Sequence, residues 1–110
     1  MSDTNYFSGI VKILKTPVKR FINKKIIKVT VLVEIPQIRK NRIVYLTFWG
    51  NLAQEVKNYY QVNDYVLIEG YLSIEKKTSE LFSENQKKMI ITVLKIYPFL
   101  LKSNYDNIKV

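Results

Sequence analysis

Basic and aromatic side chains are the residues of this chain whose types and spacing could do chemistry. The 110-residue sequence has 18 Lys and Arg against 9 Asp and Glu, and ten of the basic but only two of the acidic residues fall within residues 1–42. So uneven a distribution indicates an anionic partner, for which nucleic acid and an anionic membrane are both candidates. The alternative is a solvated basic face that only keeps the protein soluble.

Aromatic and hydroxyl side chains recur at period two beside this basic region. Tyr45, Thr47 and Trp49 have this spacing, and so do Lys28 and Thr30. Aromatic planes can stack on nucleobases at ~1–3 kcal/mol per base, whatever the base, while lysine and arginine bind backbone phosphates. Two further segments carry basic residues that could line a phosphate track: Lys19, Arg20, Lys24, Lys25, Lys76, Lys77, Lys87 and Lys88.

Each aromatic candidate also has an ordinary structural alternative. Trp49 lies next to Gly50 at the end of an expected strand, where it could instead anchor the core or its rim. Tyr45 could pack against a second subunit. These alternatives stay open from the sequence.

Catalysis and metal binding find little support in the composition. Cysteine and histidine are absent, which removes thiolate nucleophiles, imidazole bases and nearly every zinc, copper or haem site. The remaining lysines, tyrosines and carboxylates show no activated pair, and Glu75, Glu80 and Glu84 fall among lysines in an expected loop. We therefore expect a non-catalytic protein without a metal or another cofactor.

The sequence also bears on location. Its longest uncharged stretch, residues 43–54, is shorter than the ~20 apolar residues that cross a bilayer, so we expect a soluble protein without a membrane-spanning segment. Of the two anionic candidates we expect nucleic acid as the partner, and no membrane. Residues 1–5 resemble neither a secretory signal nor a transit peptide, so the protein should act where it is made. The abundance of Lys, Ile, Asn, Tyr and Phe indicates an AT-rich genome, which predicts an organelle-encoded plastid protein or a bacterial cytoplasmic one.

Alternation of apolar and polar residues predicts three strands in the first half of the chain. They span residues 6–14, 24–35 and 42–49, with Thr16-Pro17 ending the first. One face of the second strand and one face of the third are apolar and are expected to form the core. The residues of these two faces are Ile27, Val29, Val31, Val33, Ile35, Val44, Leu46 and Phe48.

The second half predicts one helix and two strands. Asn51 as N-cap and Gln54 three residues later predict a short helix that ends near Tyr60. A fourth strand is predicted at residues 65–74, with a bulge or bend at Gly70. A loop follows at residues 75–88, and a fifth strand covers residues 89–97 and is ended by Pro98.

The order of three strands, a helix and two strands is that of the OB-fold. We therefore predict an all-β, five-stranded Greek-key barrel with one short helix between strands three and four. An SH3-like barrel of this length rarely has a helix at that position. An OB barrel binds single strands on the outward face of strands two and three and on the flanking loops, which is where the candidates above fall. Residues 1–98 would form this domain, and residues 99–110 a C-terminal tail.

Two stretches resemble the single-stranded DNA-binding protein family of bacteria and organelles. They are Phe48-Trp49-Gly50-Asn51-Leu52-Ala53 and, after the helix, the strand from Val62 to Leu72. The segment from Ile10 to Phe21 is similar to the first strand and turn of that family, and the resemblance covers about residues 7–97. Primosomal accessory proteins built on the same barrel, which bind single strands more through lysines, are also similar.

The resemblance implies a protein that binds single-stranded DNA in replication or repair and that assembles as a homo-oligomer, a dimer or tetramer. Three positions at which family members carry base-stacking tryptophans hold Gln37, Ile43 and Lys77 here. Only the family's phenylalanine at the end of strand three has an aromatic counterpart in this chain, which is Trp49. Two alternatives remain at this point. One is an RNA-binding OB module, and the other is a protein-interaction subunit of a replication or translation complex that has lost base stacking.

Overall fold

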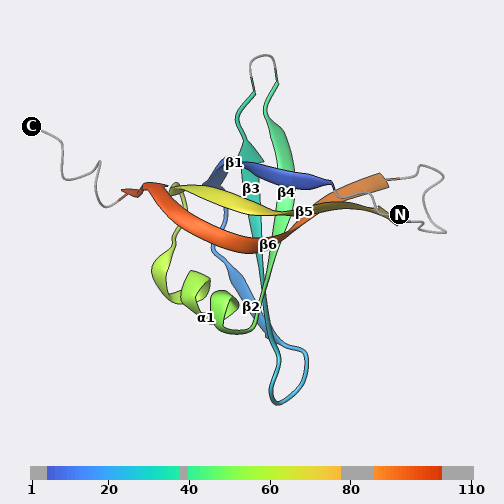
Figure 1. The fold of residues 1–110 in the computed structure, drawn as a ribbon, viewed down its shortest axis with the longest axis vertical. Coiled ribbons are helices and arrows are strands. Elements are labelled where there is room, and N and C mark those ends of the chain that lie inside the picture. The colour runs from blue at the N-terminus through green and yellow to red at the C-terminus, as the bar shows by residue number, and fades with distance from the viewer. Residues whose placement is uncertain (1–4, 38–39, 78–85, 103–110) are drawn as a thin grey trace, which may run out of the picture.

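The computed structural model describes residues 5–37, 40–77 and 86–102 (Figure 1). Its elements, in chain order, are β1 (Tyr6–Ile13), β2 (Val18–Phe21), β3 (Ile27–Ile35), β4 (Arg42–Trp49), α1 (Gly50–Tyr59), β5 (Tyr65–Lys77) and β6 (Gln86–Leu100). The strands form one sheet in the order β1-β5-β6-β4-β3-β2, and an additional pairing of β1 with β3 closes it into a barrel. The helix lies between β4 and β5, as predicted.

The core forms from the apolar side of this closed sheet. Val29, Val31 and Val33 of β3 are at most 1% exposed, and so are Val44, Leu46 and Phe48 of β4, as their alternation predicted. The helix adds Ala53 and Val56 to the same cluster. Because successive strand residues point to opposite faces, burying this set leaves the other face of β3 and β4 outside the barrel.

A short strand that the sequence did not predict, β2, forms a hairpin with β3. It pairs antiparallel from Val18 opposite Thr30 to Phe21 opposite Ile27. The turn is held by the Asn23 side-chain oxygen, which accepts hydrogen bonds from the backbone N–H groups of Lys25 and Ile26 at 2.8 and 3.0 Å. The expected strand start at residue 24 is therefore wrong, because residues 22–26 form the turn.

The helix begins without the predicted side-chain cap. Trp49 is the N-cap residue and makes no side-chain capping hydrogen bond. Gly50 has φ of 64°, a conformation that costs glycine little, so the chain turns directly out of β4. Asn51 therefore lies inside the first turn rather than before it, and the predicted capping box of Asn51 and Gln54 is wrong.

Strands β5 and β6 are longer than predicted and form a projecting hairpin (Figure 1). They include both ends of the expected loop at 75–88, whose residues 78–85 lie outside the described part. A register shift between Glu69 and Gly70 confirms the expected irregularity. Pro98 does not end the last strand, because it pairs with Val66 of β5. The pairing of β6 with β4 covers only residues 90–92, so Pro98 lies where the other side of β6 is an edge among the described strands, and proline is tolerated on such an edge.

Asp64 fastens the end of β6 to the helix–β5 connection. Its side chain is 1% exposed, and its carboxylate accepts hydrogen bonds from the backbone N–H groups of Gln61 and Lys102, at 2.9 and 2.7 Å. The chain is thus held as far as Lys102. Residues 103–110 of the expected tail lie outside the described residues.

Candidate nucleic-acid interface

The outward face of β3 and β4 brings together the residues predicted from period-two spacing. The register of the two strands places Lys28 opposite Trp49 and Thr30 opposite Thr47. Tyr45 lies opposite Leu32, two residues further along the same face. The face therefore combines a cation, hydroxyls and aromatic rings, and it lies opposite the core.

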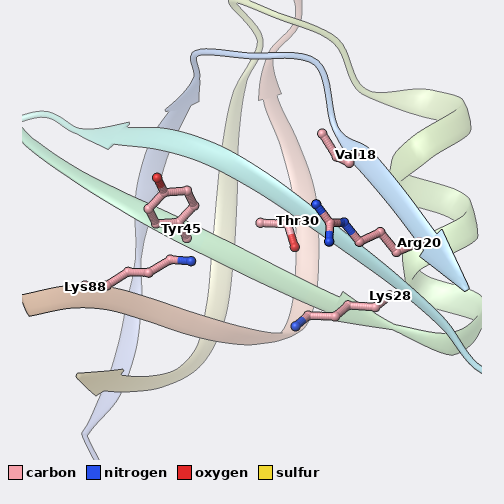
Figure 2. Close-up of a pocket in the computed structure, with 6 residues that line it drawn as sticks. All are labelled: Val18, Arg20, Lys28, Thr30, Tyr45 and Lys88. Carbon is pink, nitrogen blue, oxygen red and sulfur yellow. The ribbon is translucent and has the colours of Figure 1, made fainter. Parts of the chain in front are cut away.

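A pocket of ≈ 300 Å³ opens on this face (Figure 2). Three cationic side chains from three different strands line it, and none of its lining residues is acidic; the full set is Val18, Arg20, Lys28, Thr30, Tyr45 and Lys88. Figure 2 shows Arg20 of β2 and Lys88 of β6 entering from opposite sides, with Thr30 between them. Such a concave cationic surface attracts anions.

Each aromatic ring of the face has a lysine over it. The Lys28 Nζ atom lies 5.4 Å from the centroid of the Trp49 ring, and the Lys88 Nζ atom lies 4.2 Å from the centroid of the Tyr45 ring. Trp49 is 43% exposed, so it is an exposed rim residue rather than a core anchor, and Tyr45 is half-buried. Both rings are therefore placed where a ligand on the outer surface could reach them.

Thr47 lies in the centre of this face but is only 7% exposed. Its neighbours in register are Thr30 of β3 on one side and Thr92 of β6 on the other. The predicted orientation is correct, yet the two flanking strands leave little of this side chain for a ligand. The expectation that Thr47 offers a contact surface is therefore not met.

Of the four basic residues expected from the first loop, the structure brings only Arg20 into the pocket. Lys19 points to the opposite side of β2, where its Nζ atom lies 5.1 Å from the centroid of the exposed Phe21 ring. Lys24 and Lys25 are exposed in the turn at the tip of the β2–β3 hairpin. Alternation along β2 separates Lys19 from Arg20. Lys24 and Lys25 lie beyond the end of β2, in the turn, and so do not reach the pocket.

The basic residues expected from the second loop lie in the β5–β6 hairpin. Lys88 enters the pocket. The backbone register places Lys76 opposite Lys87 and Lys77 opposite Gln86, one step further along the hairpin. The side chains of Lys76, Lys77 and Lys87 lie outside the described part of the structure.

Sequence reasoning missed one residue of the pocket and one pair of aromatic residues outside it, on neighbouring strands. Val18 lines the pocket, and Tyr6 and Tyr71 form an edge-to-face pair with ring centroids 5.7 Å apart on β1 and β5. Tyr71 lies opposite Thr92, so the row through Thr47 continues across the sheet to this pair. Alternation within each expected strand could indicate which residues point outward. It could not show that Thr47 and Tyr71 belong to one row across the sheet, because that follows from the pairing of β4 with β6.

Two tyrosine hydroxyls outside the pocket have perturbed acidity. The Tyr6 hydroxyl donates a hydrogen bond to the Glu69 carboxylate, which raises the pKa of Tyr6. Burial raises the pKa of Tyr60 to about 12. Both groups therefore stay protonated at neutral pH and add no charge to the interface.

Within residues 5–37, 40–77 and 86–102, no three Asp, Glu, Cys or His side chains cluster in a way that could hold a metal ion. The same residues include no helix of the length and apolarity that would cross a lipid bilayer.

Comparison with known proteins found a relative along most of the chain. No protein-family model matches the chain. A protein of Trieres chinensis named "Putative single-stranded DNA-binding protein ycf41" is 43% identical over 104 residues, which cover 90% of this chain and 92% of that protein.

Three solved structures are similar at lower identity. The SSB domain of a Synechococcus sp. protein has a TM-score of 0.70 at 23% identity and covers 88% of this chain and 98% of that one. The second single-stranded DNA-binding protein of Mycobacterium smegmatis has a TM-score of 0.66 at 22% identity and covers 87% of this chain and 89% of that one. A small single-stranded DNA-binding protein of Streptomyces coelicolor has a TM-score of 0.64 at 19% identity and covers 90% of this chain and 97% of that one. This likeness confirms the predicted all-β OB-fold barrel with one short helix, to which β2 adds a sixth strand.

Proposed function

The chain belongs to the single-stranded DNA-binding protein family, and we propose that it binds single-stranded DNA through the outward face of β3 and β4 and the adjoining pocket. One observation carries the location of the site: Arg20, Lys28 and Lys88 line one pocket with Tyr45, the described lining of that pocket includes no acidic residue, and Lys28 also lies over Trp49. The cations would bind backbone phosphates, and the rings would stack on bases.

This division of labour sets the kind of selectivity expected. Stacking requires unpaired base faces, so a duplex offers the site only its phosphates. Because every base has a face to stack and every nucleotide a phosphate, the affinity should depend weakly on sequence and strongly on salt.

The cellular role follows from the same chemistry. A protein that covers single strands without transforming them would act in DNA replication or repair as a non-catalytic single-stranded DNA-binding protein, and we propose a plastid or a bacterial cytoplasm as its location. The abundance of residues with AT-rich codons supports such a source. No catalytic, metal or cofactor step enters the proposal.

We also propose that the chain forms a homo-oligomer. Exposed aromatic side chains on β1, β5 and β6 support it: Tyr6, Tyr71 and Tyr97 are 53%, 45% and 44% exposed outside the pocket. Patches of exposed aromatic surface are typical of protein contacts. Light scattering after gel filtration should give twice or four times the 13.0 kDa mass of one chain, and a mass of 13.0 kDa at micromolar concentration would contradict assembly.

Replacing Trp49 with alanine should weaken binding to oligo-dT by more than ~1 kcal/mol, or about fivefold in Kd, because one base loses its platform. Trp49 is 43% exposed at the end of β4, so the fold should remain intact by circular dichroism. Fluorescence anisotropy of a labelled oligonucleotide measures the change. An unchanged Kd would remove Trp49 from the site.

The function itself is tested by titrating the intrinsic emission of this single tryptophan with oligo-dT, an RNA of matching length and a duplex. We expect quenching by oligo-dT that salt reverses, and weaker binding to the duplex. Tighter binding to the RNA would assign the site to an RNA-binding module. Unchanged emission together with no mobility shift would contradict nucleic-acid binding.

A further inference from the structure

Two lysines lie over the two aromatic rings of the interface, and they come from the two strands on either side of β4. Lys28 of β3 is directly opposite Trp49, with 5.4 Å between its Nζ atom and the ring centroid. Lys88 of β6 is two residues before Ile90, the partner of Tyr45, with a corresponding distance of 4.2 Å. Both distances are within the ~6 Å over which an ammonium is attracted to an aromatic ring.

An ammonium over a ring and a base stacked on the same ring face compete for the same space. A base that arrives without a charged backbone must displace the ammonium, and the attraction between ammonium and ring is then lost without replacement. A nucleotide carries a phosphate joined to its base through the sugar. The phosphate offers the displaced ammonium a new and stronger partner, because both groups carry a full charge.

We propose that Lys28 and Lys88 cover the stacking surfaces of Trp49 and Tyr45 in the free protein and that backbone phosphates draw them off, so that phosphate binding uncovers the rings for bases. This inference rests on the proposed function, and it adds a coupling between the two parts of one ligand. By thermodynamic linkage, phosphate and base each raise the affinity for the other. The face thereby favours intact polynucleotide over free bases or other flat aromatic molecules.

The coupling predicts changes of opposite sign for two ligands. Oligo-dT with its natural backbone should bind the double variant Lys28→Ala/Lys88→Ala more weakly than the wild type. Oligo-dT with an uncharged methylphosphonate backbone should bind the same variant about two- to fivefold more tightly per uncovered ring, which is the equivalent of ~0.5–1 kcal/mol for an exposed cation–ring contact. Anisotropy of labelled oligonucleotides measures all four affinities.

Lys95→Ala is the matched control, because Lys95 is an exposed lysine of the same strand, β6, outside the pocket. It should slightly weaken binding of the natural strand and leave that of the uncharged strand unchanged. An uncharged strand that binds the double variant no more tightly than the wild type, including one that binds neither, would overturn the coupling. A wild type that does not bind natural oligo-dT would instead overturn the proposed function.

A second measurement uses the emission of Trp49 to report whether Lys28 moves. A phosphodiester strand of abasic sites carries phosphates and no bases, so it should draw Lys28 from the indole and change the emission of Trp49 in the wild type. The same strand should leave the emission of Lys28→Ala unchanged, whereas oligo-dT should still quench it. Equal responses of the two proteins to the abasic strand would show that the phosphate does not move Lys28.

Discussion

Reversing the charge of two pocket cations, in the variant Arg20→Glu/Lys28→Glu, should lower the affinity for oligo-dT about 25-fold at 0.1 M salt. Each phosphate contact with a single strand contributes about 0.7 to the slope of log K against log salt, so losing two contacts should reduce the slope by about 1.4. Both side chains line the pocket from neighbouring strands. Anisotropy titrations at four salt concentrations measure both quantities.

The fold should tolerate this exchange. Arg20 and Lys28 lie directly opposite one another, so the variant replaces one pair of like charges with another and leaves their repulsion similar. Lys24→Glu/Lys25→Glu is the matched control, because it changes the net charge equally at the tip of the hairpin. It should weaken binding less than fivefold and change the slope by less than about 0.7. Equal losses in the two variants would contradict a binding site centred on the pocket.

Replacing Gly70 with alanine should destabilise the protein by about 3 kcal/mol, the upper end of the range for overpacked interiors. A Cβ atom at this position would lie 2.2 Å from the backbone oxygen of Thr92 and 2.9 Å from its carbonyl carbon. Backbone atoms cannot rotate away, so β5 and β6 must separate at the bulge. The same stretch of β6, from Ile90 to Thr92, pairs with β4, and the damage should therefore reach the binding face.

Gly9→Ala is the control for this substitution. A Cβ atom there would meet the end of the Phe7 ring at 2.9 Å, and a ring can turn. Urea denaturation should show a loss of stability below about 1 kcal/mol for Gly9→Ala and a much lower midpoint for Gly70→Ala. Similar midpoints for the two variants would mean that the β5–β6 contact can relax.

The features that the sequence predicted correctly depend on short-range patterns. Alternation in residues 27–35 and 42–49 identified both the buried face and the outward face of β3 and β4, because a strand exposes every second residue to the same side. The change of period after Gly50 located the helix. These signals need no knowledge of which strands are neighbours.

The features that the sequence analysis missed depend on pairing between residues far apart in the chain. The contact of Lys88 with Tyr45 and the burial of Thr47 both follow from the parallel pairing of β4 with β6, which joins residues more than 40 positions apart. Strand β2 has four residues and no alternating apolar pattern, so it is defined only by its partner β3. Without that strand, Lys19 and Arg20 could not be assigned to opposite sides.

The most direct test of the account is to locate the bound strand on the surface. Photo-crosslinking of an oligo-dT that carries 5-iododeoxyuridine, followed by mass spectrometry of the crosslinked peptides, identifies which aromatic residues contact bases. We predict crosslinks to Trp49 and Tyr45, the two rings beside the pocket. Crosslinks confined to Tyr6, Tyr71 or Tyr97 would place the bases on β1, β5 and β6 and would contradict the proposed interface.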